Sequence, residues 1–113
     1  MLRIRLHGRG GQGIKTASQI LGSSGFFSGL QAQDFPLYGA ERRGAPIVAY
    51  TRLNPEFILE RGAIACPDLI LVGDETLLDD PLAAPISGAD ENTNLFINSS
   101  HAAAELKEHF HLP

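Results

Sequence analysis

The sequence of 113 residues contains one cysteine, Cys66, and no tryptophan. A single cysteine excludes an internal disulfide, and without a C-x-x-C pair the chain alone cannot ligate a cysteine-bound zinc ion or iron–sulfur cluster. No apolar run approaches the roughly 18 residues of a membrane helix, and the N-terminus lacks a signal-peptide core. The formal charge of −4 is not typical of a nucleic-acid-binding protein. We therefore expect a soluble cytoplasmic protein with no membrane or nucleic-acid partner.

Residue patterns that perform covalent catalysis or hold metals are also missing. The sequence has no G-x-S-x-G motif and no paired-carboxylate constellation. His101 and His109 would lie about 80° apart around a helix, which does not suit a shared metal. Cys66 precedes Pro67 at the start of an apolar run, which favours a small core thiol over a nucleophile. We expect no catalytic residue and no metal site in this chain.

What the sequence does contain is a succession of strand and helix patterns. At the N-terminus, apolar residues alternate with Arg3, Arg5 and His7, which predicts a strand with one apolar and one polar face. Further strands are predicted at 30–35, 47–53, 68–74 and 95–97, and helices at 14–28, 56–64 and from Ser99 or Ser100 to Phe110. Residues 36–44 and 79–94 are expected to be irregular, because prolines and glycines interrupt them.

These elements predict an α/β fold for residues 1–113 as a single domain. The expected architecture is a three-layer sandwich around a largely parallel sheet. The strand at 68–74 is apolar at every position between Asp68 and Asp74, so we expect it at the centre of the sheet. In the first helix, Ile14, Ala17, Leu21 and Ser24 are predicted to share one face, and Gly22 and Gly25 indicate close packing against the sheet.

The stretch HGRGGQGIKT resembles two phosphate-binding motifs. Gly8, Gly10 and Gly13 fit the G-x-G-x-x-G dinucleotide fingerprint, in which backbone N–H groups approach a pyrophosphate. The triphosphate-loop pattern G-x-x-x-x-G-K-T fails by one residue, because Ile14 separates Gly13 from Lys15. One residue rotates a helical side chain by about 100°, so Lys15 is predicted to point away from the loop.

Candidate ligand-binding residues gather in this loop and in a later arginine pair: Gly8, Arg9, Gly10, Gly11, Gln12, Gly13, Arg42 and Arg43. Guanidinium groups match phosphate oxygens bidentately, but Arg42 and Arg43 suit carboxylates of another subunit equally well. The alternatives are a purely structural turn for the loop and a solvated charge run for the arginines. Asp34 is correctly spaced for a ribose-binding carboxylate, but the charged first strand argues against a nicotinamide-binding fold and favours a strand-capping or turn-making aspartate.

Two stretches together, GRGGQGIKTASQIL and QAQDFPLYGAERRGAPIVAYTRL, resemble the gamma subunit or gamma domain of the 2-oxoacid:ferredoxin oxidoreductases, the pyruvate and 2-oxoisovalerate group. The resemblance covers residues 2 to about 110. It implies a multisubunit enzyme in which partner subunits hold thiamine diphosphate and iron–sulfur clusters, the 2-oxoacid loses carbon dioxide, electrons pass to ferredoxin and coenzyme A takes the acyl group. It also implies that the gamma domain lies near the thiamine site and contacts coenzyme A.

Gamma domains of this family continue through further strands and a closing helix, so the resemblance implies that residues 1–113 are the N-terminal part of one, or are completed by a second polypeptide. Two hypotheses remain open at this point. The chain is either a non-catalytic subunit that assists coenzyme A binding and assembly, or an autonomous nucleotide-binding or interaction module. The arginine-bearing first strand predicts a partner surface and so favours the subunit.

Overall fold

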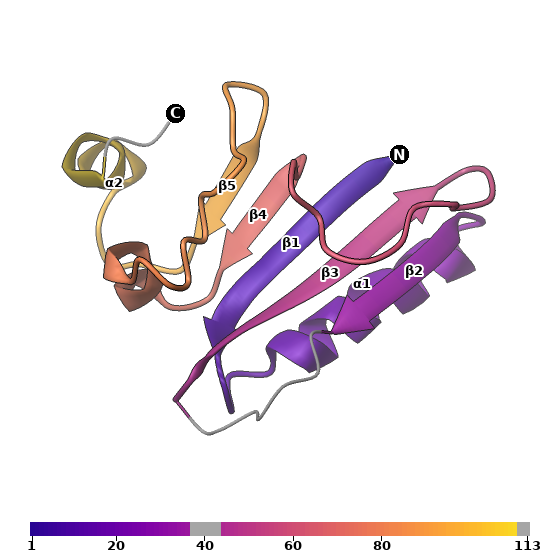
Figure 1. The fold of residues 1–113 in the computed structure, drawn as a ribbon, viewed down its shortest axis with the longest axis horizontal. Helices are drawn as coiled ribbons and strands as arrows, with labels where there is room; N and C mark the ends of the chain where they lie inside the picture. Colours follow the sequence, from indigo (N-terminus) through magenta and orange to yellow (C-terminus); the bar gives the residue numbers. More distant parts are fainter. Residues whose placement is uncertain (37–43, 111–113) are drawn as a thin grey trace.

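The fold is a five-stranded mixed sheet with one long helix against one face (Figure 1). The computed structural model describes residues 1–36 and 44–110. Within that part of the chain the elements are β1 (Leu2–Arg9), α1 (Ile14–Phe27), β2 (Gln31–Pro36), β3 (Pro46–Asn54), β4 (Leu69–Val72), the 3₁₀ helix η1 (Glu75–Asp79), β5 (Asn94–Ile97) and α2 (Ala103–Phe110). None of the described helices is both long and apolar enough to cross a membrane.

The α/β fold class predicted from the sequence is confirmed, with a mixed sheet in place of a largely parallel one. The strand order is β2-β3-β1-β4-β5. β1 pairs parallel with β4, and β4 parallel with β5, whereas β3 runs antiparallel to both β1 and β2. The centre of the sheet is therefore β1, and β4, expected there, lies one position further out.

The helical layer is α1, which lies across β1, β2 and β3 on one face of the sheet (Figure 1). Its buried positions are Ile14, Ser18, Gly22 and Gly25, so the expected face is rotated slightly and Ser24 is exposed. A Cβ on Gly25 would lie 2.3 Å from Leu53 Cδ2, which confirms the close packing expected there. Ile14 joins Ile4, Leu6 and Ala49 in the core between this helix and the sheet.

A polar cluster also lies under α1. The hydroxyl of Ser18, which is fully buried, donates to the carboxylate of Asp34 and lies 2.8 Å from Thr51 Oγ1. Asp34 sits inside β2, so the expectation of a strand-capping or turn-making aspartate is wrong. Its carboxylate instead satisfies a hydroxyl that burial has removed from water.

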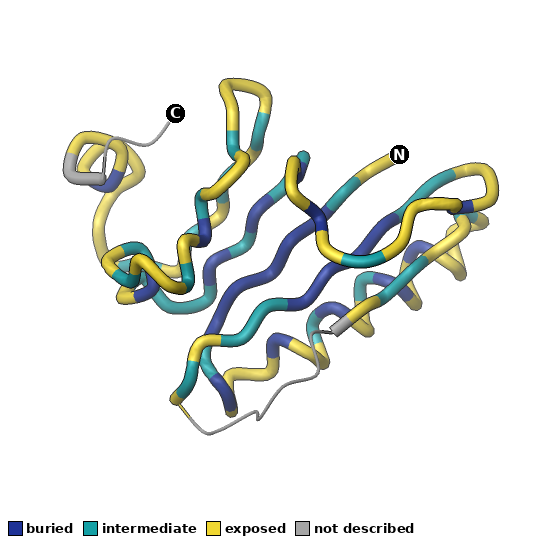
Figure 2. Tube along the Cα trace, viewed as in Figure 1, coloured by how far each residue is buried: buried dark blue, intermediate teal, exposed yellow. Residues whose placement is uncertain are grey.

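The opposite face of the sheet carries buried arginines, and loops cover it. Arg5, 5% exposed, donates from Nη1 to the carbonyl of Ile64 at 3.0 Å and from Nη2 to that of Pro85 at 2.9 Å. Arg52, 3% exposed, donates to the carbonyls of Gly62 and Ala63. Figure 2 shows the resulting band of buried residues along β1 and β3. The expectation that the polar face of β1 needs a partner is wrong for Arg5, because the chain itself buries that side chain.

No helix forms at 56–64, where one was predicted, and the segment instead lies over the arginine layer. Here the carbonyls of residues 60 and 62–64 accept from the side chains of Gln33, Arg52 and Arg5. Ile58 and Ile64 are buried in the same segment. These tertiary contacts take the place of the predicted helix.

The side chain of His7 completes the layer as a hydrogen-bond acceptor. Arg5 Nε donates to His7 Nε2 at 2.8 Å, so this imidazole nitrogen must be unprotonated. Burial, and secondarily the charge of Arg5, lower the pKa of His7 to about 4. Protonation would remove the acceptor and place two cations side by side in a buried site.

The His7 site predicts a pH-dependent stability. Between the unfolded pKa of about 6.5 and the folded pKa of about 4, only the unfolded chain takes up the proton, so the free energy of unfolding falls as pH is lowered through this window. The loss should reach about 3 kcal/mol. Urea unfolding across this range should show a flatter profile for His7→Gln, which keeps an acceptor but does not titrate. His101→Gln, at an exposed histidine, is the control and should keep the wild-type slope. An unchanged slope in His7→Gln would contradict the assignment.

Candidate functional site

The glycine loop, residues 8–13, lies at the carboxyl edge of the parallel strands. It joins the end of β1 to the start of α1, and the turn from β4 into η1 lies beside it (Figure 1). The N–H of Gly73, which follows β4, donates to the carbonyl of His7 at 2.8 Å and ties the two strand ends together. In α/β sheets this edge is where ligands bind.

At each glycine of the loop, the structure shows a different reason why a side chain would fit poorly or why the backbone is constrained. A Cβ on Gly8 would lie 2.3 Å from Ile14 Cγ1, so Gly8 lets the helix pack closely on the strand. Gly11 and Gly13 have φ of 91° and 80°, the left-handed region that other residues enter at a cost. Gly10 is buried, and its N–H donates to the carbonyl of Ala45 at 2.8 Å. Gly8 and Gly10 are therefore structural, whereas Gly11 and Gly13 form the exposed turn.

The loop ends in a helix N-terminus without a side-chain cap. Gly13 is the N-cap residue, and the first intrahelical hydrogen bond of α1 runs from Ala17 N to Gly13 O at 2.8 Å. The amides of residues 14–16 precede that bond. Such amides, with the partial positive charge of a helix N-terminus, favour an anion.

Arg9 holds the loop to the neighbouring segments. Its Nε and Nη2 donate to Thr76 Oγ1 at 3.2 and 2.9 Å, and its Nη1 donates to the carbonyl of Gly44 at 3.0 Å. Nε also lies 3.5 Å from Asp74 Oδ2, with the two side chains 26% and 21% exposed. The guanidinium group thus lies between β3, the loop and η1.

Gln12 and Asp74 extend this network. Gln12 accepts from the backbone N–H of Arg9 at 2.8 Å and donates to Asp74 Oδ2 at 3.0 Å. Asp74 also accepts from the hydroxyl and the N–H of Thr76, and these two bonds, with smaller contributions from Gln12 and Arg9, lower the pKa of its carboxyl group. Asp74 is therefore ionised at neutral pH and brings a negative charge to the edge of the loop.

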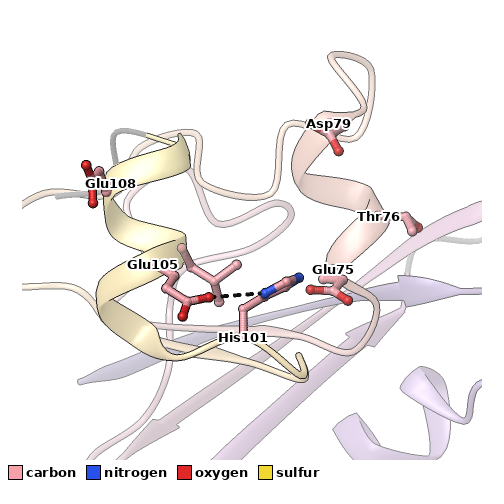
Figure 3. Close-up of a pocket in the computed structure, with 7 residues that line it drawn as sticks. Glu75, Thr76, Asp79, His101, Glu105 and Glu108 are labelled. Atoms are coloured by element: carbon pink, nitrogen blue, oxygen red, sulfur yellow. Dashed lines mark hydrogen bonds and ion pairs between the residues drawn. The ribbon is translucent and has the colours of Figure 1, made fainter.

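A second feature of this edge is a pocket between η1 and α2 with a volume of about 640 Å³. His101 lies between Glu75 and Glu105, and its Nδ1 is 3.2 Å from Glu105 Oε2 (Figure 3). The remaining lining residues are Thr76, Asp79, Leu106 and Glu108. Four carboxylates make this pocket unsuitable for a phosphate, in contrast to the start of α1.

The structure brings together some of the predicted site residues and leaves others undescribed. Gly8 and Arg9 end β1, and Gly10 to Gly13 follow directly and lead into α1. Arg42 and Arg43 fall outside the described residues. Lys15 is exposed on the first turn of α1.

Two further predictions can be compared with the structure. Cys66 is exposed, so its assignment as a core thiol is wrong. Among the described residues no group of three histidine, cysteine or carboxylate side chains is arranged to hold a metal.

Sequence reasoning missed Asp74, Thr76 and the acidic pocket. Asp74 caps the short helix η1 through Thr76 N, and an aspartate directly after a buried strand is a recognisable capping signal. The helix α2 begins at Ala103, later than predicted; Ser99, which accepts from the N–H of His101 and donates to Glu75, lies before it. The pocket joins residues of η1 to residues of α2, and no local pattern indicates that contact.

The fold and the loop define the class: an α/β domain whose strand, glycine loop and helix open at the carboxyl edge of a mixed sheet. Residues 3–113 match the family described as pyruvate ferredoxin/flavodoxin oxidoreductase. The chain therefore belongs to this family, and the resemblance to its gamma subunits is confirmed.

Individual relatives support the same family assignment. The chain is 44% identical over 100 residues to pyruvate synthase subunit PorC of Methanothermobacter marburgensis, covering 88% of this chain and 55% of the relative. It is 40% identical over 108 residues to the pyruvate/ketoisovalerate oxidoreductases common subunit gamma of Thermococcus litoralis, covering 96% and 57%. The crystal structure of pyruvate oxidoreductase subunit PORC from Thermotoga maritima matches with a TM-score of 0.80 at 36% identity, covering 98% and 57%. The chain spans about half the length of the curated relatives it matches.

Proposed function

We propose that this chain acts as the gamma-type component of a thiamine-diphosphate-dependent 2-oxoacid:ferredoxin oxidoreductase. The complex would decarboxylate a 2-oxoacid oxidatively, pass two electrons to ferredoxin and transfer the acyl group to coenzyme A. The observation that carries the proposal is the similarity to gamma subunits of pyruvate and ketoisovalerate oxidoreductases along nearly the whole of this chain. A cytoplasmic location is part of the same proposal.

In this proposal the redox cofactors belong to partner subunits. A [4Fe–4S] cluster needs four thiolates, and this chain has one cysteine. Thiamine diphosphate, which supplies the carbanion chemistry of decarboxylation, is likewise assigned to a partner. The contribution of this chain is then to help assemble the complex and to bind coenzyme A, with no covalent step of its own.

The glycine loop is the proposed contact with coenzyme A. The exposed turn at Gly11 and Gly13 leads directly into the amides of residues 14–16, which fit one phosphate group. Arg9 ends the strand that leads into this turn and has a guanidinium fork that suits phosphate oxygens. The fit is incomplete in one respect, because Asp74 already lies against Arg9. The arginines at 42 and 43 are proposed as further phosphate or subunit contacts.

Purified alone, the chain should be catalytically silent. Dye reduction dependent on a 2-oxoacid should appear only after the other subunits are added, because the chain lacks cluster ligands and a nucleophile–base pair. The control is the partner mixture without this chain. Turnover by the chain alone would contradict the proposal. Failure to associate with those subunits, combined with retained nucleotide binding, would favour the autonomous module instead.

The loop proposal predicts how three variants change the dissociation constant of coenzyme A in the assembled enzyme. Gly11→Val should weaken binding about tenfold or more, because it forces a β-branched residue to a φ of 91° in the exposed turn. Arg9→Ala should weaken it by about tenfold through loss of a charged hydrogen-bond donor. Lys15→Ala is the matched control and should change it less than about twofold.

Calorimetric titration with coenzyme A measures all three. A loss confined to Lys15→Ala would overturn the register argument and restore the triphosphate-loop reading. No loss in any variant would make the loop a structural turn.

A further inference from the structure

The N–H groups of the Arg9 side chain are already engaged. Among the described residues, the hydrogen-bond acceptors of its three nitrogens belong to Thr76 and Gly44, and none belongs to the first turn of α1. A phosphate bound at the start of α1 would therefore compete with these acceptors for the guanidinium group.

Asp74 uses its two oxygens differently. Oδ1 accepts from the N–H and hydroxyl of Thr76 at 3.0 and 2.5 Å, which is a capping role in η1. Oδ2 faces the loop, where it accepts from Gln12 Nε2 at 3.0 Å and lies 3.5 Å from Arg9 Nε. Capping needs only the first oxygen, so the second provides a separate contact with the loop.

The guanidinium group of Arg9 cannot bind the Asp74 carboxylate and a phosphate group fully at the same time. Carboxylate and phosphate oxygens offer the same kind of acceptor to the same N–H groups. The Asp74 side chain is only 21% exposed and that of Arg9 26%, so water screens the pair incompletely. An anion arriving at the loop would also be repelled by the carboxylate.

Resting on the proposed function, we infer that Asp74 is an internal competitor for Arg9 and thereby restrains phosphate binding at the glycine loop. The contact is autoinhibitory: the ligand must displace Asp74 from Arg9 before the arginine closes on it. Gln12, bonded both to Asp74 and to the backbone of Arg9, holds the restrained arrangement together.

The test is the affinity of the full chain, in its assembled complex, for inorganic pyrophosphate and for coenzyme A. Asp74→Asn keeps an oxygen that can cap Thr76 and removes the charge. It should bind both probes about two- to fivefold more tightly than wild type, the range expected for a partly exposed ion pair. The gain should shrink at high salt, because salt screens exposed charges.

The matched control is Glu91→Gln, which removes one negative charge from the turn that precedes the amino end of β5, away from the carboxyl edge. Its affinity should equal that of wild type. In an Arg9→Ala background the gain from Asp74→Asn should shrink to the part that direct charge repulsion supplies. A gain that persists there undiminished would mean simple repulsion and would overturn the competition.

The outcomes separate the two claims. If wild type binds the probes and Asp74→Asn binds equally or more weakly, the inference fails while the proposed loop function stands. If neither protein binds either probe, the proposed loop function fails, and the inference fails with it.

A second measurement needs no substitution at Asp74. In ¹⁵N spectra of wild type, the Nε signal of Arg9, assigned with Arg9→Lys, should shift as pyrophosphate is added. Loop amide shifts without any change at Arg9 Nε would overturn the inference even if Asp74→Asn fails to fold.

Discussion

The structure depends on two arginines, Arg5 and Arg52, that are buried on one face of the sheet. A buried guanidinium group is tolerated only when its N–H groups find acceptors. These arginines take them from backbone carbonyls at residues 62–64, 85 and 87, together with side chains of the same layer. The segments that carry those carbonyls are irregular and cover the sheet as loops. Removing either arginine would leave both an exposed sheet face and unpaired carbonyls.

The strand β1, which carries Arg5, also leads into the glycine loop. Leu6 is fully buried and joins Ile14 in the core, while Gly8 allows that isoleucine to approach the strand end. The loop is therefore held between a packed strand and a packed helix, and the N–H groups of Arg9, Gly10 and Gln12 are bonded within the chain. The side chain of Arg9 takes its partners from η1 and from Gly44.

The sequence predicted what local patterns control. Alternation identified β1, and the spacing of glycines identified the turn into α1, within one or two residues of the observed bounds. It failed where distant residues decide. The segment 56–64 is irregular and contacts the buried Arg5 and Arg52. β4 is not central because β3 pairs with β1, and the contact of Asp74 with Arg9 joins residues far apart in the chain. In the candidate site, the glycines were found from spacing, whereas the carboxylate that opposes them was not.

The central proposal is that the glycine loop receives the phosphates of coenzyme A at the start of α1. A crystal structure of the assembled complex with coenzyme A tests this most directly. We expect a phosphate oxygen about 3 Å from amide nitrogens of residues 11–16, with Arg9 turned from Asp74 toward the ligand. Coenzyme A bound elsewhere, with the loop and the Arg9–Asp74 contact unchanged, would contradict it.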